Sequence, residues 1–220
     1  MSKAVVDKHE TNKRERTKYF LEIFQKAEKK YSKNKKRLAG EGWKEDWMTL
    51  IATILSAQTR DETTIPVAEA LFKKYPKIHL LAKAKLHDVE KTIKRINFYK
   101  NKSKNIIGAA KWLMANGYTD GSVPDTIEEL IKIPGVGRKT ANLIITEVHK
   151  KDGICVDTHV HRISNVFGFV NTKNPKETEF ALMDIVPRKY WSKINRIFVL
   201  WGKEVKGRDK EKFLKKLNSP

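Results

Sequence analysis

Two ionisable side chains, Lys139 and Asp157, follow a glycine-rich turn at a spacing that lets neighbouring helices present them together. Lys139 falls in the first turn of an expected helix, where the positive end of the helix dipole disfavours an ammonium and so favours the nucleophilic amine. Partial burial against the turn would favour the amine further. Asp157 is expected at the start of the next helix, where aspartate is a favoured cap. An amine together with a carboxylate that stabilises a positively charged sugar suits attack on a sugar carbon.

The glycine-rich turn, residues 133–137, predicts an anion site just before Lys139. Pro134 ends the preceding helix because it lacks an N–H group, while Gly135 and Gly137 permit positive φ and expose backbone N–H groups. A tight turn that leads into a helix N-terminus directs N–H groups and the helix dipole at an anion. Taken singly, the turn is an ordinary helix connection, the lysine a solvated side chain and the aspartate a simple cap. Only their combination favours a reactive site.

The charge balance indicates a polyanionic partner. Among 220 residues, 46 lysines and arginines against 26 acidic residues give a net charge of +20, which makes a DNA phosphate the expected anion. A membrane is disfavoured because no apolar run approaches the ~20 residues that span a bilayer, and the polar N-terminus lacks the apolar core of a signal peptide. We therefore expect an intracellular protein of the cytoplasm or nucleoid, although a lysine-rich composition also accompanies growth at high temperature.

Apolar residues recur at helical spacing along most of the chain, and no convincing stretch alternates with the period of two that marks a strand. The expected fold is therefore all-α. Asp46 is an expected N-cap, as is either Asp125 or Thr126, and the chain before residue 19 is expected to fray. Helices are expected over about 19–27, 47–55, 64–75, 86–96, 106–114, 127–131, 138–148, 157–167 and 191–201, with a further helix start that resembles a capping box at 174–177.

Three segments carry a resemblance to a known family. Residues 133–142 read IPGVGRKTAN, residues 156–162 read VDTHVHR, and residues 54–61 read ILSAQTRD. Together they resemble endonuclease III, of the helix-hairpin-helix Gly-Pro-Asp DNA glycosylase superfamily, over about residues 47–201. The resemblance implies that Lys139 displaces the base and forms a Schiff base, and that Asp157 is the essential carboxylate. An adenine-removing branch of the superfamily has no lysine at this position, so Lys139 favours a glycosylase that is also a lyase.

The resemblance also implies two helical domains with the active site in the cleft between them. One domain of six helices, which contains the helix-hairpin-helix, is expected at 42–152. The second is expected to combine 1–41 with 153–220. Lys139 and Asp157 would then come from opposite sides of the cleft.

The cofactor expectation departs from the common family pattern. Many relatives hold an iron–sulfur cluster through four cysteines near the C-terminus, whereas Cys155 is the single cysteine of this chain. We therefore expect no cluster and no internal disulfide, with Cys155 as a buried small apolar residue. The one ion that the resemblance implies is a Na⁺ or K⁺ held by the backbone carbonyls of Ile131, Ile133 and Val136, where it would strengthen phosphate binding.

The resemblance assigns DNA contacts outside the catalytic pair. Gln58 matches the residue that fills the gap left by a flipped nucleotide, and Phe98 lies in the region of an apolar wedge. Asp61 and His159 match positions that line the base pocket, and Arg162 would reach a phosphate. Without the resemblance, Gln58 reads as a helix-end residue, Phe98 as a core aromatic, His159 as a first-turn residue and Arg162 as a solvated side chain. The hairpin completes the expected DNA-binding set with Gly135, Val136, Gly137, Arg138 and Thr140.

The expected function is base excision by a monomeric enzyme. Its partner would be double-stranded DNA with a damaged or abasic nucleotide, from which it removes oxidised pyrimidines and then cleaves the strand. Within the same fold, a mismatch glycosylase that removes uracil or thymine opposite guanine is an alternative, since the loops that decide it cannot be read from the sequence. A non-catalytic helix-hairpin-helix DNA-binding protein is the alternative from another class, against which Lys139 and Asp157 argue.

Overall fold

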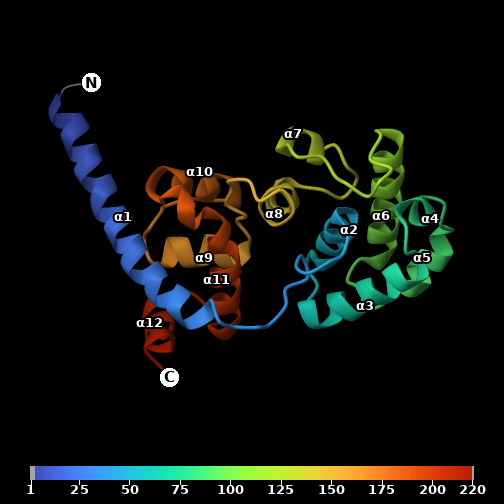
Figure 1. Ribbon diagram of the computed structural model, residues 1–220. Helices are drawn as coiled ribbons and strands as arrows, with labels where there is room; N and C mark the ends of the chain where they lie inside the picture. The colour runs from blue at the N-terminus through green and yellow to red at the C-terminus, as the bar shows by residue number, and fades with distance from the viewer. Residues whose placement is uncertain (1–2, 220) are drawn as a thin grey trace. The chain divides into compact units, whose positions relative to one another are not determined.

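The computed structural model describes residues 3–219, with side chains from residue 12 onward. Every regular element among these described residues is a helix, which confirms the expected all-α fold. The chain divides into two compact units, one of residues 36–151 and one that joins the chain before residue 36 to the chain from residue 152 onward. In Figure 1 the helices are labelled and coloured from blue to red along the chain.

The unit of residues 36–151 is built around α2, which is buried along almost its whole length. Leu50, Ile51 and Leu55 of α2 have no exposed surface, and the helix packs against α3, α6 and α8 (Figure 1). Burial of an aliphatic side chain of this size contributes about 1.5–3 kcal/mol, so α2 fixes the helices that carry the candidate site. The helices of this unit are α2 Asp46–Ser56, α3 Asp61–Lys74, α4 Ile78–Ala82, α5 Leu86–Thr92, α6 Tyr99–Ala115, α7 Ile127–Leu130 and α8 Arg138–Glu147.

The second unit joins the two ends of the chain through an aromatic core. Phe20 of the first helix lies 5.1 Å from Phe169, and Phe213 of the last helix lies 5.1 Å from Trp201, each measured between ring centroids in T-shaped contact. Aromatic pairs prefer this edge-to-face geometry, so both terminal helices are fixed to the helices between them. The elements of this unit are α1 Lys3–Tyr31, α9 Thr158–Val166, α10 Pro175–Ile185, the short 3-10 helix η1 Arg188–Tyr190, α11 Trp191–Glu204 and α12 Lys210–Asn218.

Two local expectations are wrong and one is resolved. The first helix begins at Lys3 rather than near residue 19, in a stretch that contains neither glycine nor proline. Asp46 is the first residue of α2, and Glu45 is its N-cap. Thr126, rather than Asp125, caps α7, because its side chain accepts a hydrogen bond from the backbone N–H of Glu129 at 3.3 Å.

None of the described helices is both long enough and apolar enough to cross a bilayer.

Candidate functional site

The turn expected to bind an anion forms a hairpin between α7 and α8. The backbone N–H of Val136 donates to the carbonyl of Ile133 at 3.0 Å. Gly135 has a φ of 82°, the left-handed conformation that glycine adopts without steric cost. The next helix begins where the N–H of Ala141 donates to the carbonyl of Gly137 at 2.9 Å. The first turn of an α-helix has N–H groups without intrahelical partners, which suits this end to an anion.

The hairpin lies directly on α6. A Cβ atom placed on Gly135 would come within 2.8 Å of the Cβ of Asn105, and one placed on Gly108 would lie 3.2 Å from ring atoms of Pro134. Both glycines therefore allow a close approach between the hairpin and the helix. The position of the hairpin is set by α6, and the hairpin cannot move further toward that helix.

Gly137 differs from the expectation of positive φ. Its φ is −99° and its ψ is 176°, an extended conformation that any residue can adopt. A Cβ atom at this position would meet no atom of the chain within 4 Å. Neither backbone conformation nor internal packing requires glycine here, so the position leaves room for an external group to approach the N-terminus of α8.

Lys139 is the second residue of α8, and its side chain is exposed. The expected partial burial of this lysine is therefore wrong, and the residue lies at the surface, directly after the hairpin. Arg138 is half-buried, whereas Thr140 is buried at 9% exposure. Of these two expected DNA contacts, Arg138 is therefore the more exposed.

Asp157 is the N-cap of α9, as its residue type predicts. Its Oδ1 atom accepts hydrogen bonds from the backbone N–H groups of His159 and Val160, both at 2.9 Å. Two bonds to one oxygen fix the orientation of the carboxylate, and the side chain is partly exposed. Just before the cap, the carbonyl of Cys155 accepts a bond from the side-chain amide of Asn195 at 2.9 Å, which holds the start of α9 against α11.

Arg162 is turned into the second unit rather than outward. Its guanidinium donates to the carbonyls of Gly202, Val205 and Gly207 at 2.7, 3.0 and 3.0 Å. Burial lowers the pKa of this guanidinium. The last carbonyls of a helix have no intrahelical partners, so Arg162 satisfies the end of α11 and ties it to α9. This arrangement explains the residue without a phosphate contact.

His159 packs against Gly202, a residue that no sequence motif singles out. A Cβ atom on Gly202 would come within 2.4 Å of Nδ1 of His159. Only glycine leaves space for the imidazole ring, which is partly exposed beside the Asp157 cap. Gly202 therefore determines where the expected base-pocket histidine lies.

Gln58 and Phe98, which we call the wedge, lie on two loops of the 36–151 unit that the structure brings together. Both side chains are exposed, Phe98 by 63%, which excludes a core role for this ring. Both residues have left-handed backbones, with φ of 54° and 58°, which is uncommon for residues other than glycine. The side-chain amide of Asn97 donates to the carbonyl of Gln58, and the backbone N–H of Asn97 donates to Thr59 Oγ1 at 3.2 Å. The wedge therefore projects from one linked pair of loops.

Asp61 begins α3, and its Oδ1 atom accepts a hydrogen bond from the backbone N–H of Ala39 at 3.2 Å. This bond ties α3 to the segment that precedes α2. The expected site residues divide between the units: Gln58, Asp61, Phe98, the hairpin and Lys139 belong to residues 36–151, and Asp157, His159 and Arg162 belong to the second unit.

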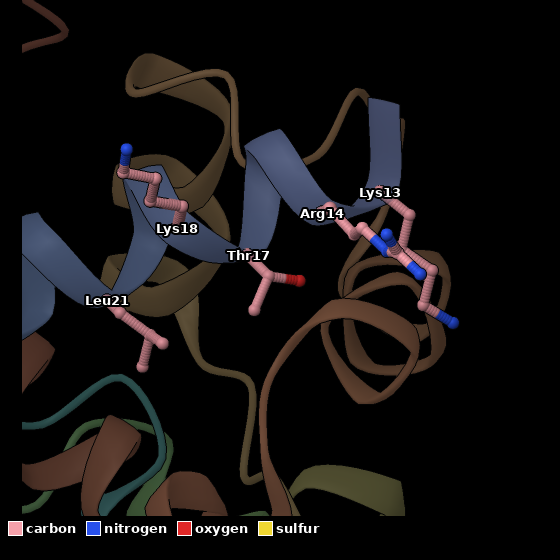
Figure 2. A pocket seen from close by; sticks show the side chains of 5 residues that line it. All are labelled: Lys13, Arg14, Thr17, Lys18 and Leu21. Atoms are coloured by element: carbon pink, nitrogen blue, oxygen red, sulfur yellow. The ribbon is translucent and has the colours of Figure 1, made fainter. Parts of the chain in front are cut away.

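A hollow of about 510 Å³ beside α1 contains none of the expected site residues. It is lined by Lys13, Arg14, Thr17, Lys18 and Leu21 (Figure 2). Lys13 forms an ion pair with Asp184, and Thr17 donates to the carbonyl of Ile185 at 2.8 Å. These bonds attach α1 to α10, so two residues of the lining serve the packing of this unit.

The residues of the chain do not fit an iron–sulfur cluster. A cluster takes four thiolates, and Cys155 is the only cysteine of the sequence and is buried, as expected. Among the described residues, no group of three His, Cys, Asp or Glu side chains gathers to hold a metal ion. At the hairpin, the carbonyl of Ile133 accepts a hydrogen bond from Val136, which occupies one of its two lone pairs.

Comparisons with known proteins place this geometry in context. The sequence pattern of the HhH-GPD superfamily, described as base excision DNA repair proteins, matches residues 51–188. The endonuclease III of Thermotoga maritima is 44% identical over 156 residues, which cover 71% of this chain and 72% of that protein. The endonuclease III of Synechocystis sp. is 38% identical over 157 residues, which cover 71% of each protein.

A solved structure has the same fold. It is a trapped endonuclease III–DNA covalent intermediate, with 31% sequence identity and a TM-score of 0.80 over 88% of this chain and 89% of that chain. The region that matches the superfamily pattern contains the wedge, the hairpin, Lys139 and Asp157.

Proposed function

Because the chain belongs to the HhH-GPD superfamily of base excision DNA repair proteins, and within it to the endonuclease III family, we propose that it is a bifunctional DNA glycosylase and AP lyase that removes oxidised pyrimidines. The observation that carries the proposal is the placement of Lys139, an exposed lysine in the first turn of α8 directly after the hairpin. A glycosylase that uses water alone has no need of a nucleophilic amine at this point.

The hairpin and the start of α8 bind a phosphate of the DNA backbone. Gly137 leaves room for the phosphate, and the helix N-terminus supplies N–H groups and a positive dipole. The backbone carbonyls of Ile131, Ile133 and Val136 would hold a Na⁺ or K⁺ ion, whose charge adds to the attraction. The net charge of +20 supplies sequence-independent affinity for the rest of the duplex.

The damaged nucleotide has to leave the duplex before its sugar carbon can be attacked. The wedge of Gln58 and Phe98 enters the space that the nucleotide vacates, where an aromatic ring can stack on a neighbouring base. Asp61 and His159 are the residues that we expect to contact the extruded base. Lys139 and Asp157 act on the same deoxyribose.

The proposed reaction needs one amine, from Lys139, and one carboxylate, from Asp157. The Lys139 nitrogen forms a bond to C1′ while the bond from C1′ to the base breaks, and the base leaves with the electron pair and takes up a proton. The carboxylate of Asp157 stabilises the positive charge that develops on the sugar. The ring then opens: the bond from C1′ to O4′ breaks, O4′ takes up the proton that the nitrogen loses, and a Schiff base forms. Removal of a C2′ proton by a base or by water breaks the bond to the 3′ phosphate, which leaves with the electron pair, so the strand is nicked. Water finally hydrolyses the Schiff base and releases the lysine.

Reduction with borohydride tests the role of Lys139. With a duplex that contains thymine glycol, we expect a covalent protein–DNA adduct that survives denaturation. Lys139→Ala should give no adduct, whereas Lys111→Ala, which removes an exposed lysine of α6, should give as much as the unaltered protein. An adduct with uracil opposite guanine but not with thymine glycol would reassign the substrate to mismatches. An adduct that persists in Lys139→Ala would disprove the assignment of the nucleophile.

A further inference from the structure

Lys102, in the first turns of α6, is a charged residue that is only 6% exposed. Its ammonium donates to the carbonyl of Leu55 at 2.8 Å, to the carbonyl of Ala57, and to Thr59 Oγ1 at 3.2 Å. These bonds use all three N–H groups of an ammonium. Burial lowers the pKa of Lys102 to about 8. Burial of an ammonium costs free energy, and the hydrogen bonds to these three uncharged partners offset that cost.

The acceptors of Lys102 belong to the end of α2 and to the loop that follows it. A helix leaves its last carbonyls without intrahelical partners, and the helix dipole favours a cation beside them. Lys102 occupies that place at Leu55, while the carbonyl of Ser56 accepts from the N–H of Thr59 at 3.0 Å. The helix therefore ends at a fixed residue, and Gln58 follows with its left-handed φ of 54°. Such a conformation persists at a residue other than glycine only where the surroundings hold it.

The backbone of Lys102 holds the second loop of the wedge. Its N–H donates to the carbonyl of Phe98 at 3.0 Å, and Phe98 is the N-cap of α6 with a φ of 58°. Asn97, the neighbour of Phe98, bonds to Gln58 and to Thr59 of the first loop. Thr59 Oγ1 is therefore shared between the loops, and Lys102 contacts one loop through its backbone and the other through its side chain.

We propose that Lys102 is a positioning residue that holds Gln58 and Phe98 as one preset wedge before DNA arrives. This inference rests on the proposed function, because the wedge has a role only where a nucleotide is flipped. The ammonium is engaged by three oxygens of its own unit, so it acts through the wedge and not on the substrate. Loops that are ordered in advance lose less conformational entropy when they enter the duplex.

Lys102→Met tests the proposal because it removes the three donors and keeps an unbranched side chain. We expect single-turnover excision of thymine glycol from a duplex to fall on the order of tenfold or more, since small misplacements of positioning groups have effects of this size. Strand cleavage at an abasic site in single-stranded DNA should stay near the rate of the unaltered protein, because no gap has to be filled. Lys111→Met, at an exposed position of the same helix, should leave both rates unchanged.

A second comparison separates positioning from general destabilisation. In a background of Gln58→Ala with Phe98→Ala the wedge is absent, and Lys102→Met should then cause no further loss of duplex excision, because residues that act together are not additive. Equal losses on both substrates, or a full further loss in this background, would overturn the proposal. If the unaltered protein neither excises thymine glycol nor forms a covalent adduct with DNA, the proposed function is wrong. That result is obtained without any substitution, so it is distinct from a failure of the proposal for Lys102.

Thr59→Val provides the same test if circular dichroism shows that Lys102→Met does not fold. It removes the oxygen that Lys102 and Asn97 share, while two carbonyls remain for the ammonium. We expect slower excision from the duplex and unchanged cleavage of the single-stranded abasic substrate. Unchanged duplex excision in Thr59→Val would contradict the proposal.

Discussion

Asp157 combines two roles in one side chain, a helix cap and a charge. An asparagine amide oxygen caps a helix as well as a carboxylate does, whereas only the carboxylate stabilises a positively charged sugar. Asp157→Asn should therefore change the free energy of unfolding by less than about 0.5 kcal/mol. It should lower single-turnover excision on the order of a hundredfold or more, as the loss of a transition-state electrostatic contact does. Urea denaturation and kinetics on the same sample measure the two effects.

Asp157→Ala is the matched variant, because it removes the cap together with the charge. Its unfolding free energy should fall by about 0.5–2 kcal/mol, through loss of the bonds to His159 and Val160. Excision should be as low as in Asp157→Asn. An Asp157→Asn protein that excises normally would show that the charge is not needed, and one as unstable as Asp157→Ala would refute the capping argument.

Single residues were predictable from sequence where their partners are near in the chain. The cap at Asp157 and the place of Lys139 depend on neighbours within one helical turn, which residue type and spacing reveal. Lys102 and Arg162 depend on carbonyls 47 and 40 residues away, at Leu55 and Gly202. The spacing of residues in the sequence contains no information on such distant partners. The role of Lys102 was therefore missed, and Arg162 was expected to contact a phosphate.

The last helix, α12, is attached to its unit by a buried aromatic ring and by charged side chains. Phe213 has no exposed surface and meets Trp201 in a T-shaped contact at 5.1 Å. At the other end of the helix, the ammonium of Lys30 donates to the carbonyls of Lys216 and Ser219 at 2.8 and 2.7 Å. An ion pair between Lys216 and Glu204 at 3.2 Å adds a further contact to α11, so a buried ring and charged side chains together attach this helix.

Phe213→Ala should lower the free energy of unfolding by about 3–5 kcal/mol, the usual cost of deleting a buried ring. The control is Phe180→Ala in α10, where the ring is 51% exposed and the expected change is less than about 0.5 kcal/mol. Denaturation in urea, followed by tryptophan fluorescence, measures both variants. If the two variants lose the same stability, Phe213 does not hold this part of the chain.

Helices were predictable where they bury one face. The helix at Pro175–Ile185 also has a start signal that the structure confirms, since the N–H of Glu177 donates to Asn174 Oδ1 at 3.0 Å and the N–H of Lys173 donates to Glu177 Oε2 at 2.9 Å. The first turns of α1 were missed because a polar stretch without an apolar stripe leaves no helical period in the sequence. Periodic apolar residues therefore predict a helix only where one face of that helix is buried.

Across the whole molecule, affinity for DNA and catalysis depend on different numbers of residues. The net charge of +20 is the excess of 46 basic over 26 acidic residues distributed along the chain, and affinity for a duplex follows the number of phosphates that basic residues neutralise. In the proposed chemistry, in contrast, the bond-breaking step depends on one amine, that of Lys139. Removal of that amine should therefore affect the two properties very differently.

Lys139→Ala should abolish strand cleavage while the equilibrium affinity for an undamaged duplex stays close to that of the unaltered protein. The logarithm of the binding constant falls linearly with the logarithm of salt concentration, and loss of one phosphate contact reduces that slope by about 1. A titration of fluorescently labelled duplex at several salt concentrations should give a slope for Lys139→Ala that differs by no more than this. The double variant Arg138→Ala with Lys139→Ala removes two of the charges that follow the hairpin and should reduce the slope further. An affinity that falls as steeply as the cleavage rate in Lys139→Ala would mean that this lysine holds the DNA rather than attacks it.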